Sequence, residues 1–243
     1  MKVQKRFGLA RALSKMGYCS RSQAAALIRE GRVAVNGRMI RDPENPVQIG
    51  RDQIEVGGSA IAELPQVYLV MNKPRGVVTT ASDEKGRMTV YDLLDPTLPW
   101  LGPVGRLDKA SEGLLLLTND SEWAAKITDP ASHLDKTYHV QVDRVADDGL
   151  LAKITRGATV DGDRLRVKAA RVLRRGEKHS WLEVILDEGK NRHIRRLLEA
   201  LDVQVLRLVR VAVGPLALGD LTKGAVRALA VREKEAVDRA LLG

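Results

Sequence analysis

Cysteine, aromatic residues and long apolar runs are all scarce in this chain of 243 residues. The single cysteine, Cys19, excludes an internal disulfide and fits a reducing compartment. No apolar run approaches the roughly 18 residues that a membrane span requires. The basic start Met1–Phe7 leads into Gly8 and Arg11 without the apolar core of a signal peptide. These absences predict a cytoplasmic protein without a membrane partner.

The chain also lacks the common motifs of cofactor and metal chemistry. It contains no Walker loop, no G-x-G-x-x-G and no G-x-S-x-G. Its four histidines and one cysteine show no metal-ligand spacing. We therefore expect a reaction that needs no cofactor and no metal.

Positive charge is in excess and is spread unevenly. The net charge is +9, from 40 Lys and Arg against 31 Asp and Glu. Residues 1–60 hold 11 of these basic and 5 of these acidic residues, so +6 of the excess lies in the first quarter. This pattern favours a polyanionic partner bound by a basic attachment domain on a nearly balanced body. With only 3% aromatic residues, contacts to phosphates and folded RNA fit better than base stacking along a single strand.

Local patterns in the first 60 residues predict two short helices and a β-hairpin. Apolar spacing indicates a helix over residues 5–16, and Ser20 to Gln23 is a capping-box pattern that starts a second helix. Asn36-Gly37 between two short strands predicts a type I′ turn, and residues 53–56 alternate as another strand. Seven basic side chains are candidate RNA contacts, the alternative being an ordinary solvated face: Arg6, Arg11, Lys15, Arg21, Arg29, Arg32 and Arg38.

The segment Gly57 to Gln66 is glycine-rich and contains Pro65, which predicts a linker. We expect a small N-terminal α/β RNA-binding domain over residues 1–58 and a second domain over residues 67–243. The second domain is rich in predicted strands, with scattered helices and no regular β-α alternation. The sequence therefore predicts an α+β fold with a mixed, mainly antiparallel sheet and flanking helices.

The stretch from Gly105 to Asp120, G-R-L-D-K-A-S-E-G-L-L-L-L-T-N-D, combines three kinds of chemistry. It begins with a cation and a carboxylate, Arg106 and Asp108, and continues through a polar turn. Leu114 to Leu117 is fully apolar and predicts a strand buried on both faces. A carboxylate in a loop that a buried strand holds is suited to catalysis. The alternative is that Asp108 only caps a turn or pairs with Arg106.

This stretch resembles the catalytic signature of the RNA pseudouridine synthases of the RsuA/RluB type. Three other segments resemble motifs of the same family: N-K-P-x-G at residues 72–76, K-T-Y-x-V at 136–140, and E-G-K-N-R-H-I-R-R at 188–196. The order S-R-x-x-A-x-x-x-I-x-x-G-R-V-x-V-N-G near the N-terminus resembles the small RNA-binding domain first named from a small-subunit ribosomal protein.

The resemblance implies an isomerase that converts a specific uridine of ribosomal RNA into pseudouridine on a flipped-out nucleotide. It implies that Asp108 is the catalytic nucleophile or base and that Tyr138 packs on the uracil. The alternative for Tyr138 is a purely structural place in the hydrophobic core, where a tyrosine in a strand is often found. Arg192, or secondly Lys190, is expected to supply a cation beside Asp108. Three further sets of basic residues are candidates for substrate contacts. Arg106 either fills the gap that the flipped nucleotide leaves in the RNA or forms a salt bridge within its loop. Arg195 and Arg196 either contact phosphate or cover the polar side of a helix, and Lys73 lies at the entrance to the second domain.

Two other functions stay open from the sequence. One is a non-catalytic RNA-binding factor of ribosome assembly that has kept the fold. The other is a glycosidase of free nucleosides, although this leaves the basic N-terminal region without a purpose and lacks a clear second carboxylate. We expect a monomer that binds ribosomal RNA.

Overall fold

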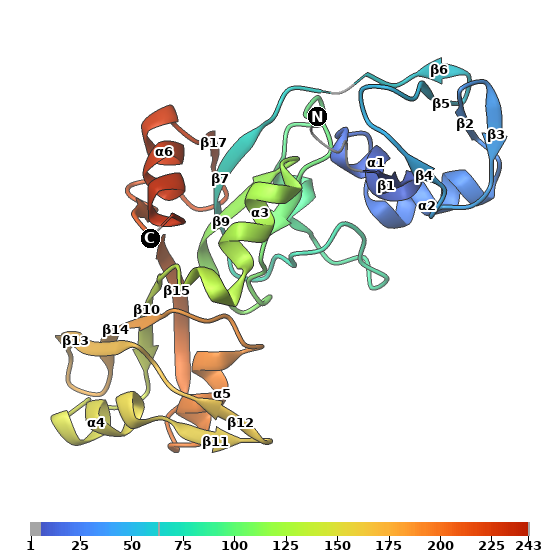
Figure 1. Cartoon of the computed structure of the whole chain (residues 1–243). Coiled ribbons are helices and arrows are strands. Elements are labelled where there is room, and N and C mark those ends of the chain that lie inside the picture. Colours follow the sequence, from blue (N-terminus) through green and yellow to red (C-terminus); the bar gives the residue numbers. More distant parts are fainter. Residues whose placement is uncertain (1–5, 63, 243) are drawn as a thin grey trace. The chain divides into compact units, whose positions relative to one another are not determined.

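The computed structural model describes residues 6–62 and 64–242, which divide into two compact units (Figure 1). The first unit comprises the described residues up to Tyr68, together with Asp95–Gly102 and Leu117–Glu122. The second unit comprises Leu69–Leu94, Pro103–Leu116 and the described residues from Trp123 onward. The predicted domain limits of 1–58 and 67–243 stay a prediction.

The first unit contains two short helices and a small antiparallel sheet in the order β3-β2-β5-β6. The predicted capping box is present, because Ser20 Oγ accepts from Gln23 N–H at 3.2 Å and Gln23 Oε1 accepts from Ser20 N–H at 3.0 Å. Asn36 and Gly37 both have positive φ, 51° and 76°, as a type I′ turn requires. The elements are β1 Phe7–Gly8, α1 Leu9–Lys15, α2 Arg21–Arg29, β2 Val33–Val35, β3 Arg38–Ile40, β4 Pro46–Val47, β5 Ile54–Val56 and β6 Ser59–Ala60.

Two boundaries in this unit differ from the sequence prediction. The first helix starts only at Leu9, because Phe7–Gly8 pairs with β4 as a strand, and residue 5 lies outside the described residues. The predicted linker was wrong for its first residues. Gly57 and Gly58, with φ of 60° and 81°, form the turn between β5 and β6, so the sheet continues to Ala60. Glu63, in the same predicted linker, lies outside the described residues.

The second unit is organised on a large sheet, and within the described residues this sheet has nine strands. Seven follow the order β13-β14-β10-β15-β9-β7-β17, with β16 beside β15 and β8 beside β9. Strand β9 pairs parallel with β15, whereas β10 is antiparallel to both β14 and β15. The strands are β7 Tyr68–Lys73, β8 Gly102–Val104, β9 Glu112–Thr118, β10 Lys136–Val142, β13 Ala169–Arg175, β14 Ser180–Leu186, β15 Val205–Val213, β16 Leu216–Ala217 and β17 Val226–Ala228.

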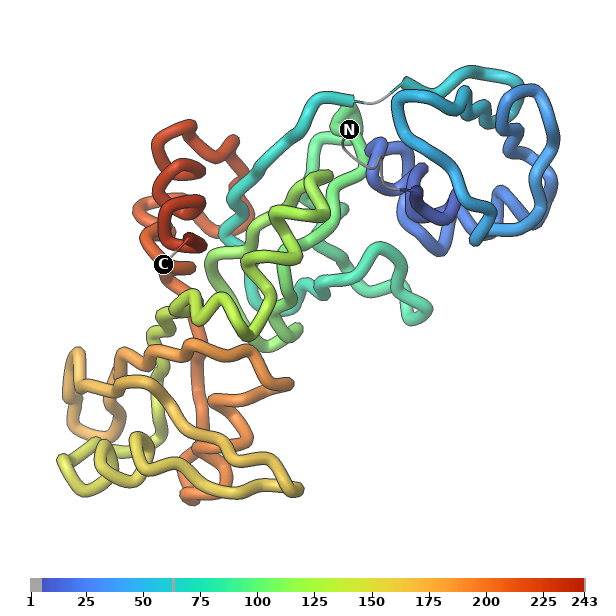
Figure 2. The backbone as a smooth tube through the Cα atoms, viewed as in Figure 1, coloured from blue at the N-terminus to red at the C-terminus, as the bar shows by residue number. Residues whose placement is uncertain are grey.

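Short helices and a hairpin surround this sheet, so the predicted α+β class with a mixed, mainly antiparallel sheet is confirmed. The backbones of α4 and α5 lie close to the end of the sheet that contains β10 and β14 (Figure 2). Apolar side chains of these two helices and two strands share one core. Among the described residues, no helix has the length and apolar character needed to cross a membrane. The remaining elements are η1 Val90–Leu93, α3 Ser121–Thr128, η2 Pro130–Ser132, α4 Asp148–Arg156, β11 Ala158–Val160, β12 Asp163–Leu165, α5 His193–Glu199 and α6 Val231–Ala240.

Strand β9 carries the apolar run and is buried along its whole length, as the sequence predicts. It begins directly after the loop that contains Asp108. Gly113 has φ +103° where β9 meets β15, and a Cβ at this position would lie only 2.2 Å from the Arg210 carbonyl oxygen. Only glycine permits this close approach of two backbones. The contact ties the start of β9 to β15 and so fixes one end of the Asp108 loop.

Candidate active site

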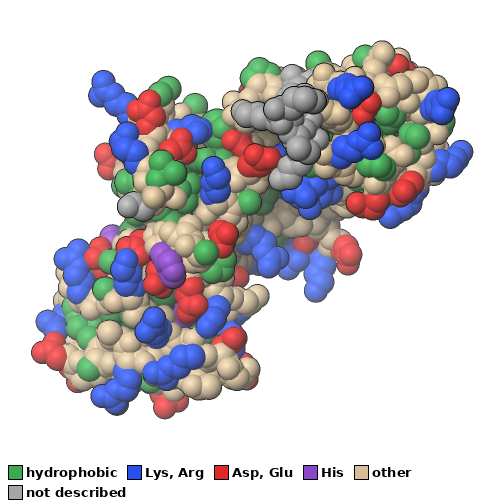
Figure 3. Space-filling model, viewed as in Figure 1, with side chains coloured by type: hydrophobic (Ala, Val, Ile, Leu, Met, Phe, Trp, Pro, Cys, Tyr) green, Lys and Arg blue, Asp and Glu red, His purple; other side chains and the backbone are tan. Residues whose placement is uncertain are grey.

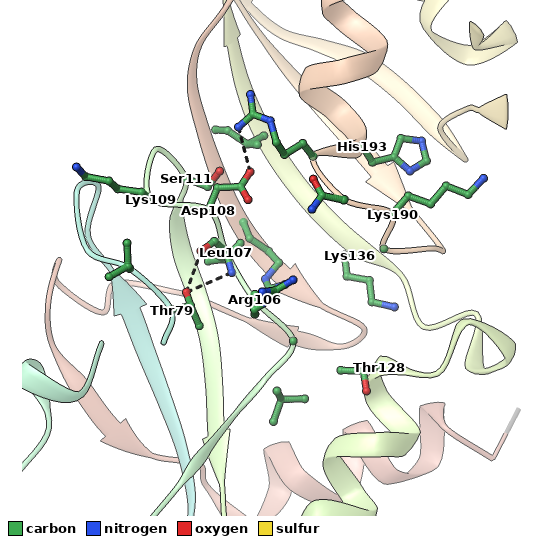
Figure 4. Close-up of a pocket in the computed structure, with 18 of the residues that line it drawn as sticks. Thr79, Arg106, Leu107, Asp108, Lys109, Ser111, Thr128, Lys136, Lys190 and His193 are labelled. Carbon is green, nitrogen blue, oxygen red and sulfur yellow. Dashed lines mark hydrogen bonds and ion pairs between the residues drawn. The ribbon is translucent and has the colours of Figure 1, made fainter. Parts of the chain in front are cut away.

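A pocket of about 730 Å³ lies within the second unit and has the size of a small-molecule site (Figure 4). Its lining comes from the segment after β7, the loop before β9, strands β10 and β15, and the segment that leads into α5. Five of the residues that the sequence singled out line it: Arg106, Asp108, Tyr138, Lys190 and Arg192.

Asp108 and Arg192 form an ion pair in this pocket. Arg192 Nη1 lies 3.7 Å from Asp108 Oδ2, which is beyond hydrogen-bond distance, and both side chains keep about 40% exposure (47% and 38%). Arg192 precedes α5 in the left-handed region, with φ of 49° and ψ of 32°. A residue other than glycine, asparagine or aspartate is uncommon there, and such conformations concentrate at functional sites. The backbone of the segment therefore directs this guanidinium to the carboxylate.

Lys73, which does not line the pocket, stabilises the backbone of the Asp108 loop by hydrogen bonds. Its Nζ donates to the carbonyl oxygens of Asp108 at 3.1 Å and Ser111 at 2.8 Å, and to that of Pro74 at 3.1 Å. The side chain is 0% exposed and does not line the pocket. Burial lowers the pKa of Lys73 to about 8, although Asp108 and Glu112 act in the opposite direction. The predicted substrate contact of Lys73 was therefore wrong, because a buried amine with three acceptors cannot reach a substrate.

Thr79 fastens the same loop from another side. Its Oγ1 donates to the Leu107 carbonyl oxygen at 2.8 Å and accepts from the Leu107 N–H at 3.4 Å (Figure 4). The Ser111 N–H donates to the Asp108 carbonyl oxygen at 2.9 Å, which closes the turn that follows. Thr79, Leu107 and Ser111 all line the pocket. The backbone on both sides of Asp108 is thus held by specific hydrogen bonds.

Tyr138 contributes a flat wall to the pocket from the middle of β10. It lies opposite Val184 of β14 and Arg210 of β15, is half-buried, and also packs against the apolar core of this part of the sheet. Lys136 stands two residues earlier and lines the same pocket. Alternate residues of a strand share a face, so these two side chains belong to one surface of the sheet. Tyr138 thus lies both in the wall of the pocket and against the hydrophobic core, the two positions that the sequence analysis considered.

The other basic residues of the third motif are engaged with the protein. Lys190 Nζ donates to the Arg164 carbonyl oxygen at 2.8 Å. Arg195 donates to the Ala110 carbonyl oxygen at 3.0 Å, and burial, followed by the charge of Arg192, lowers its pKa. Arg196 pairs at 2.9 Å with Asp163 and at 3.3 Å with Asp161, beside β12 and β11. A phosphate contact does not fit these partners of Arg196. Its side chain braces α5 against the β11–β12 hairpin.

On the face that Figure 3 shows, several exposed Lys and Arg side chains lie on the first unit, among acidic and apolar ones. Lys15 is an exception to the predicted set. Its side chain is only 16% exposed, and Nζ lies 3.3 Å from Glu122 Oε1 and 3.2 Å from Ser121 Oγ, all within the first unit. Its predicted RNA contact therefore does not fit, since the amine already has protein partners. The other predicted members are exposed: Arg6, Arg11, Arg21, Arg29, Arg32 and Arg38.

The sequence interpretation missed Thr79, Lys136 and Arg210 as parts of this site. Lys136 stands in the K-T-Y-x-V motif, so its position two residues before Tyr138 was the available signal. Thr79 and Arg210 carry no local pattern, because they reach the loop and β9 through contacts distant in sequence. In the part of the chain that the structure describes, no group of three or more His, Cys, Asp or Glu side chains is arranged to hold a metal.

The chain belongs to the RNA pseudouridylate synthase family, whose model matches residues 67–200, and an S4 domain matches residues 8–54. It is accordingly an RNA pseudouridine synthase, an isomerase.

Individual relatives agree with this classification. The chain is 37% identical over 227 residues to "Ribosomal large subunit pseudouridine synthase B" of Bacillus subtilis (strain 168), with 93% of each chain covered. It is 36% identical to an uncharacterized RNA pseudouridine synthase of Aquifex aeolicus (strain VF5), covering 89% of this chain and 88% of the relative. A solved structure, "Crystal structure of pseudouridylate synthase", aligns with a TM-score of 0.65 at 29% identity, covering 96% of this chain and 99% of the other.

Proposed function

We propose that this protein converts a specific uridine of ribosomal RNA into pseudouridine, with Asp108 as the catalytic carboxylate acting on a flipped-out nucleotide. The observation that carries the proposal is the position of Asp108, whose partly exposed carboxylate lines the pocket beside Arg192. Ribosomal RNA is supported by the name of the Bacillus subtilis relative, which is similar over 93% of both chains. The large-subunit RNA is therefore the first substrate to test.

The reaction is an isomerisation, so no atom is gained or lost. The bond between ribose C1′ and uracil N1 breaks, the base turns, and C1′ bonds to C5. The proton on C5 leaves and N1 gains one. Asp108 takes part either by attack on the nucleotide or by removal of a ribose proton, and both routes need its anionic form. Arg192 supplies a positive charge next to this carboxylate when the bound base displaces water from the pocket.

Tyr138 and the first unit have supporting roles in this proposal. The Tyr138 ring offers a flat face for the extruded uracil, as enzymes that act on flipped bases require. The S4 domain, with its exposed arginines, attaches the RNA through phosphates. The protein acts as a monomer with RNA as its partner and needs no cofactor.

The test is single-turnover conversion of a ribosomal RNA fragment by the Asp108→Asn variant. Asparagine keeps the size and shape of the side chain but removes the charge, so conversion should be abolished while RNA affinity stays within a few-fold. Asp147→Asn is the matched control. Asp147 caps α4 by accepting from Leu150 N–H, and asparagine caps a helix equally well, so this variant should convert RNA normally.

Conversion by Asp108→Asn at even a tenth of the wild-type rate would mean that the carboxylate is not the catalyst. Tighter RNA binding by this variant would not count against the proposal, because it removes a negative charge that repels phosphate. A wild-type protein that binds ribosomal RNA but converts no uridine would favour the alternative of an assembly factor.

A further inference from the structure

Two cations in the pocket have no role in the chemistry above. Arg106 and Lys136 both line it, and neither side chain has a hydrogen bond or an ion pair with any residue that the structure describes. In Figure 4 both side chains project into the space between Asp108 and Thr128. Arg192 pairs with Asp108 and Arg87 pairs with Asp83, whereas the side chains of Lys85 and Lys109, which also line the pocket, form no ion pair with any described residue. The side chains of Arg106 and Lys136 are thus available to a ligand.

Lys136 is the more informative of the two because it is half-buried at the start of β10. Asp135 and Asp187 favour its charged form, but neither forms an ion pair with it. Both oxygens of Asp135 lie 2.8 Å from the amine of Lys168, and Asp187 lies 3.9 Å from His133. Arg210, at the back of the pocket, adds a further positive charge nearby. A partly desolvated cation without a counterion is unfavourable, and an anion from the ligand would relieve this cost.

Burial, followed by the charge of Arg210, lowers the pKa of Lys136, whereas Asp135 and Asp187 act in the opposite direction. A bound anion would add to the second effect and hold the amine in its protonated form. This agrees with the geometry, in which the Lys136 side chain lines the pocket and forms no ion pair with any carboxylate of the described residues.

We propose that Lys136, together with Arg106, forms a phosphate-binding subsite that holds a backbone phosphate of the target nucleotide. The identity of the nucleotide rests on the proposed function. Lys136 and Tyr138 share one face of β10 about 6.6–6.8 Å apart. This separation is comparable with that between a pyrimidine ring and its own phosphate. A nucleotide whose uracil lies on Tyr138 therefore brings a phosphate to Lys136.

The alternative partner for Lys136 is a carbonyl oxygen on the uracil edge. Uracil is neutral, so its carbonyl oxygen would accept a hydrogen bond from the amine without balancing the positive charge. It would leave two neighbouring cations, Arg106 and Lys136, with no negative charge between them. Phosphate carries a full charge and several acceptor oxygens, so it satisfies both side chains at once.

The test measures the dissociation constants of uridine and of uridine monophosphates, with the phosphate at the 5′ or the 3′ position, for the full-length protein. We expect wild type to bind one monophosphate about tenfold more tightly than uridine, equivalent to about 1.4 kcal/mol. Lys136→Met should reduce this preference to below about threefold, and Lys136→Arg should keep it, because the charge remains. Lys153→Met, at an exposed position of α4, is the control for loss of a lysine and should keep the preference.

These measurements do not depend on turnover. Asp108→Asn should keep the preference for the monophosphate, so a failure of the proposed catalytic role leaves the subsite open to measurement. A wild-type protein that binds the monophosphates no better than uridine would overturn the proposal. So would a Lys136→Met variant that keeps the preference, or one that instead loses discrimination between uridine and cytidine, since the amine would then contact the base.

Discussion

Replacing Lys73 by methionine removes the amine behind the Asp108 loop while keeping the length of the side chain. Three carbonyl oxygens lose the donor that Lys73 supplies. The Asp108 carbonyl keeps a second donor, the Ser111 N–H, whereas the Ser111 carbonyl loses a 2.8 Å bond in a fully buried place. Leaving a buried carbonyl unsatisfied costs about 1–3 kcal/mol. The loss falls on the loop that carries Asp108, the carboxylate that we propose as the catalyst.

A second effect opposes this loss at neutral pH. Burial lowers the pKa of Lys73 to about 8, against 10.5 for an unperturbed lysine. At about 1.36 kcal/mol per unit, the charged amine costs the folded state about 3 kcal/mol at pH 7. Methionine removes this cost together with the hydrogen bonds. We therefore expect the free energy of unfolding to change by less than about 2 kcal/mol at pH 7.

The two proteins should diverge at high pH. Between pH 8 and 10.5 the unfolded chain holds a proton on Lys73 that the folded protein has lost, so the stability of wild type rises with pH. Lys73→Met lacks this gain. By pH 10 its free energy of unfolding should therefore lie about 2–3 kcal/mol further below that of wild type than at pH 7. Denaturant unfolding of both proteins at pH 7 and pH 10 measures the difference. If wild type and Lys73→Met differ in their free energy of unfolding by the same amount at both pH values, the lowered pKa of Lys73 is refuted.

Activity should respond more strongly than stability does. Lys73 does not line the pocket, so RNA affinity should stay within a few-fold, while a looser loop slows single-turnover conversion roughly tenfold to a hundredfold. Lys153→Met, which removes an exposed lysine, should leave the rate unchanged. Wild-type conversion by a folded Lys73→Met protein would show that the loop needs no such support.

Two further changes test the wall of the pocket and the attachment of RNA. Tyr138→Phe keeps the ring and should bind an RNA fragment nearly as wild type does, whereas Tyr138→Leu should lose roughly 1–3 kcal/mol of binding, the usual worth of base stacking. Full affinity in the leucine variant would assign Tyr138 to the core alone. A chain that begins at Val67 should fold but bind ribosomal RNA more weakly, with a salt dependence flatter by about 0.7–0.9 log unit for each phosphate that it no longer binds. Equal affinity and equal slope in the two chains would exclude an attachment role for the residues before Val67.

Features that depend on neighbouring residues were predictable from the sequence. The capping box at Ser20, the type I′ turn at Asn36-Gly37 and the buried strand at Leu114 to Leu117 all form as predicted, because each is determined by local hydrogen bonds or local apolar pattern. The meeting of Asp108 with Arg192 was predicted from motif resemblance and not from spacing. Residues so far apart in sequence meet only through the sheet.

Features that depend on distant contacts were not predictable. Lys73 belongs to a segment with the pattern of a basic turn, and nothing nearby in sequence shows that it is buried under a loop 35 residues further along. Thr79 is an ordinary threonine until Leu107 comes within reach of its hydroxyl. The glycine-rich Gly57-Gly58 pattern suits a linker and a hairpin turn equally, and only the pairing of β6 with β5 decides between them.

The parallel pairing of β9 with β15 also has a consequence for how the enzyme is made. A ribosome synthesises the chain from its N-terminus, so Asp108 and the apolar β9 emerge long before Arg192 and the residues of β15. Until β15 is available, the edge of β9 that it will cover has no partner, and an unpaired apolar edge favours aggregation. A nascent chain that stalls before Val205 thus carries the complete signature around Asp108 but no working pocket. The pairing that completes this part of the sheet therefore forms only after β15 has been synthesised.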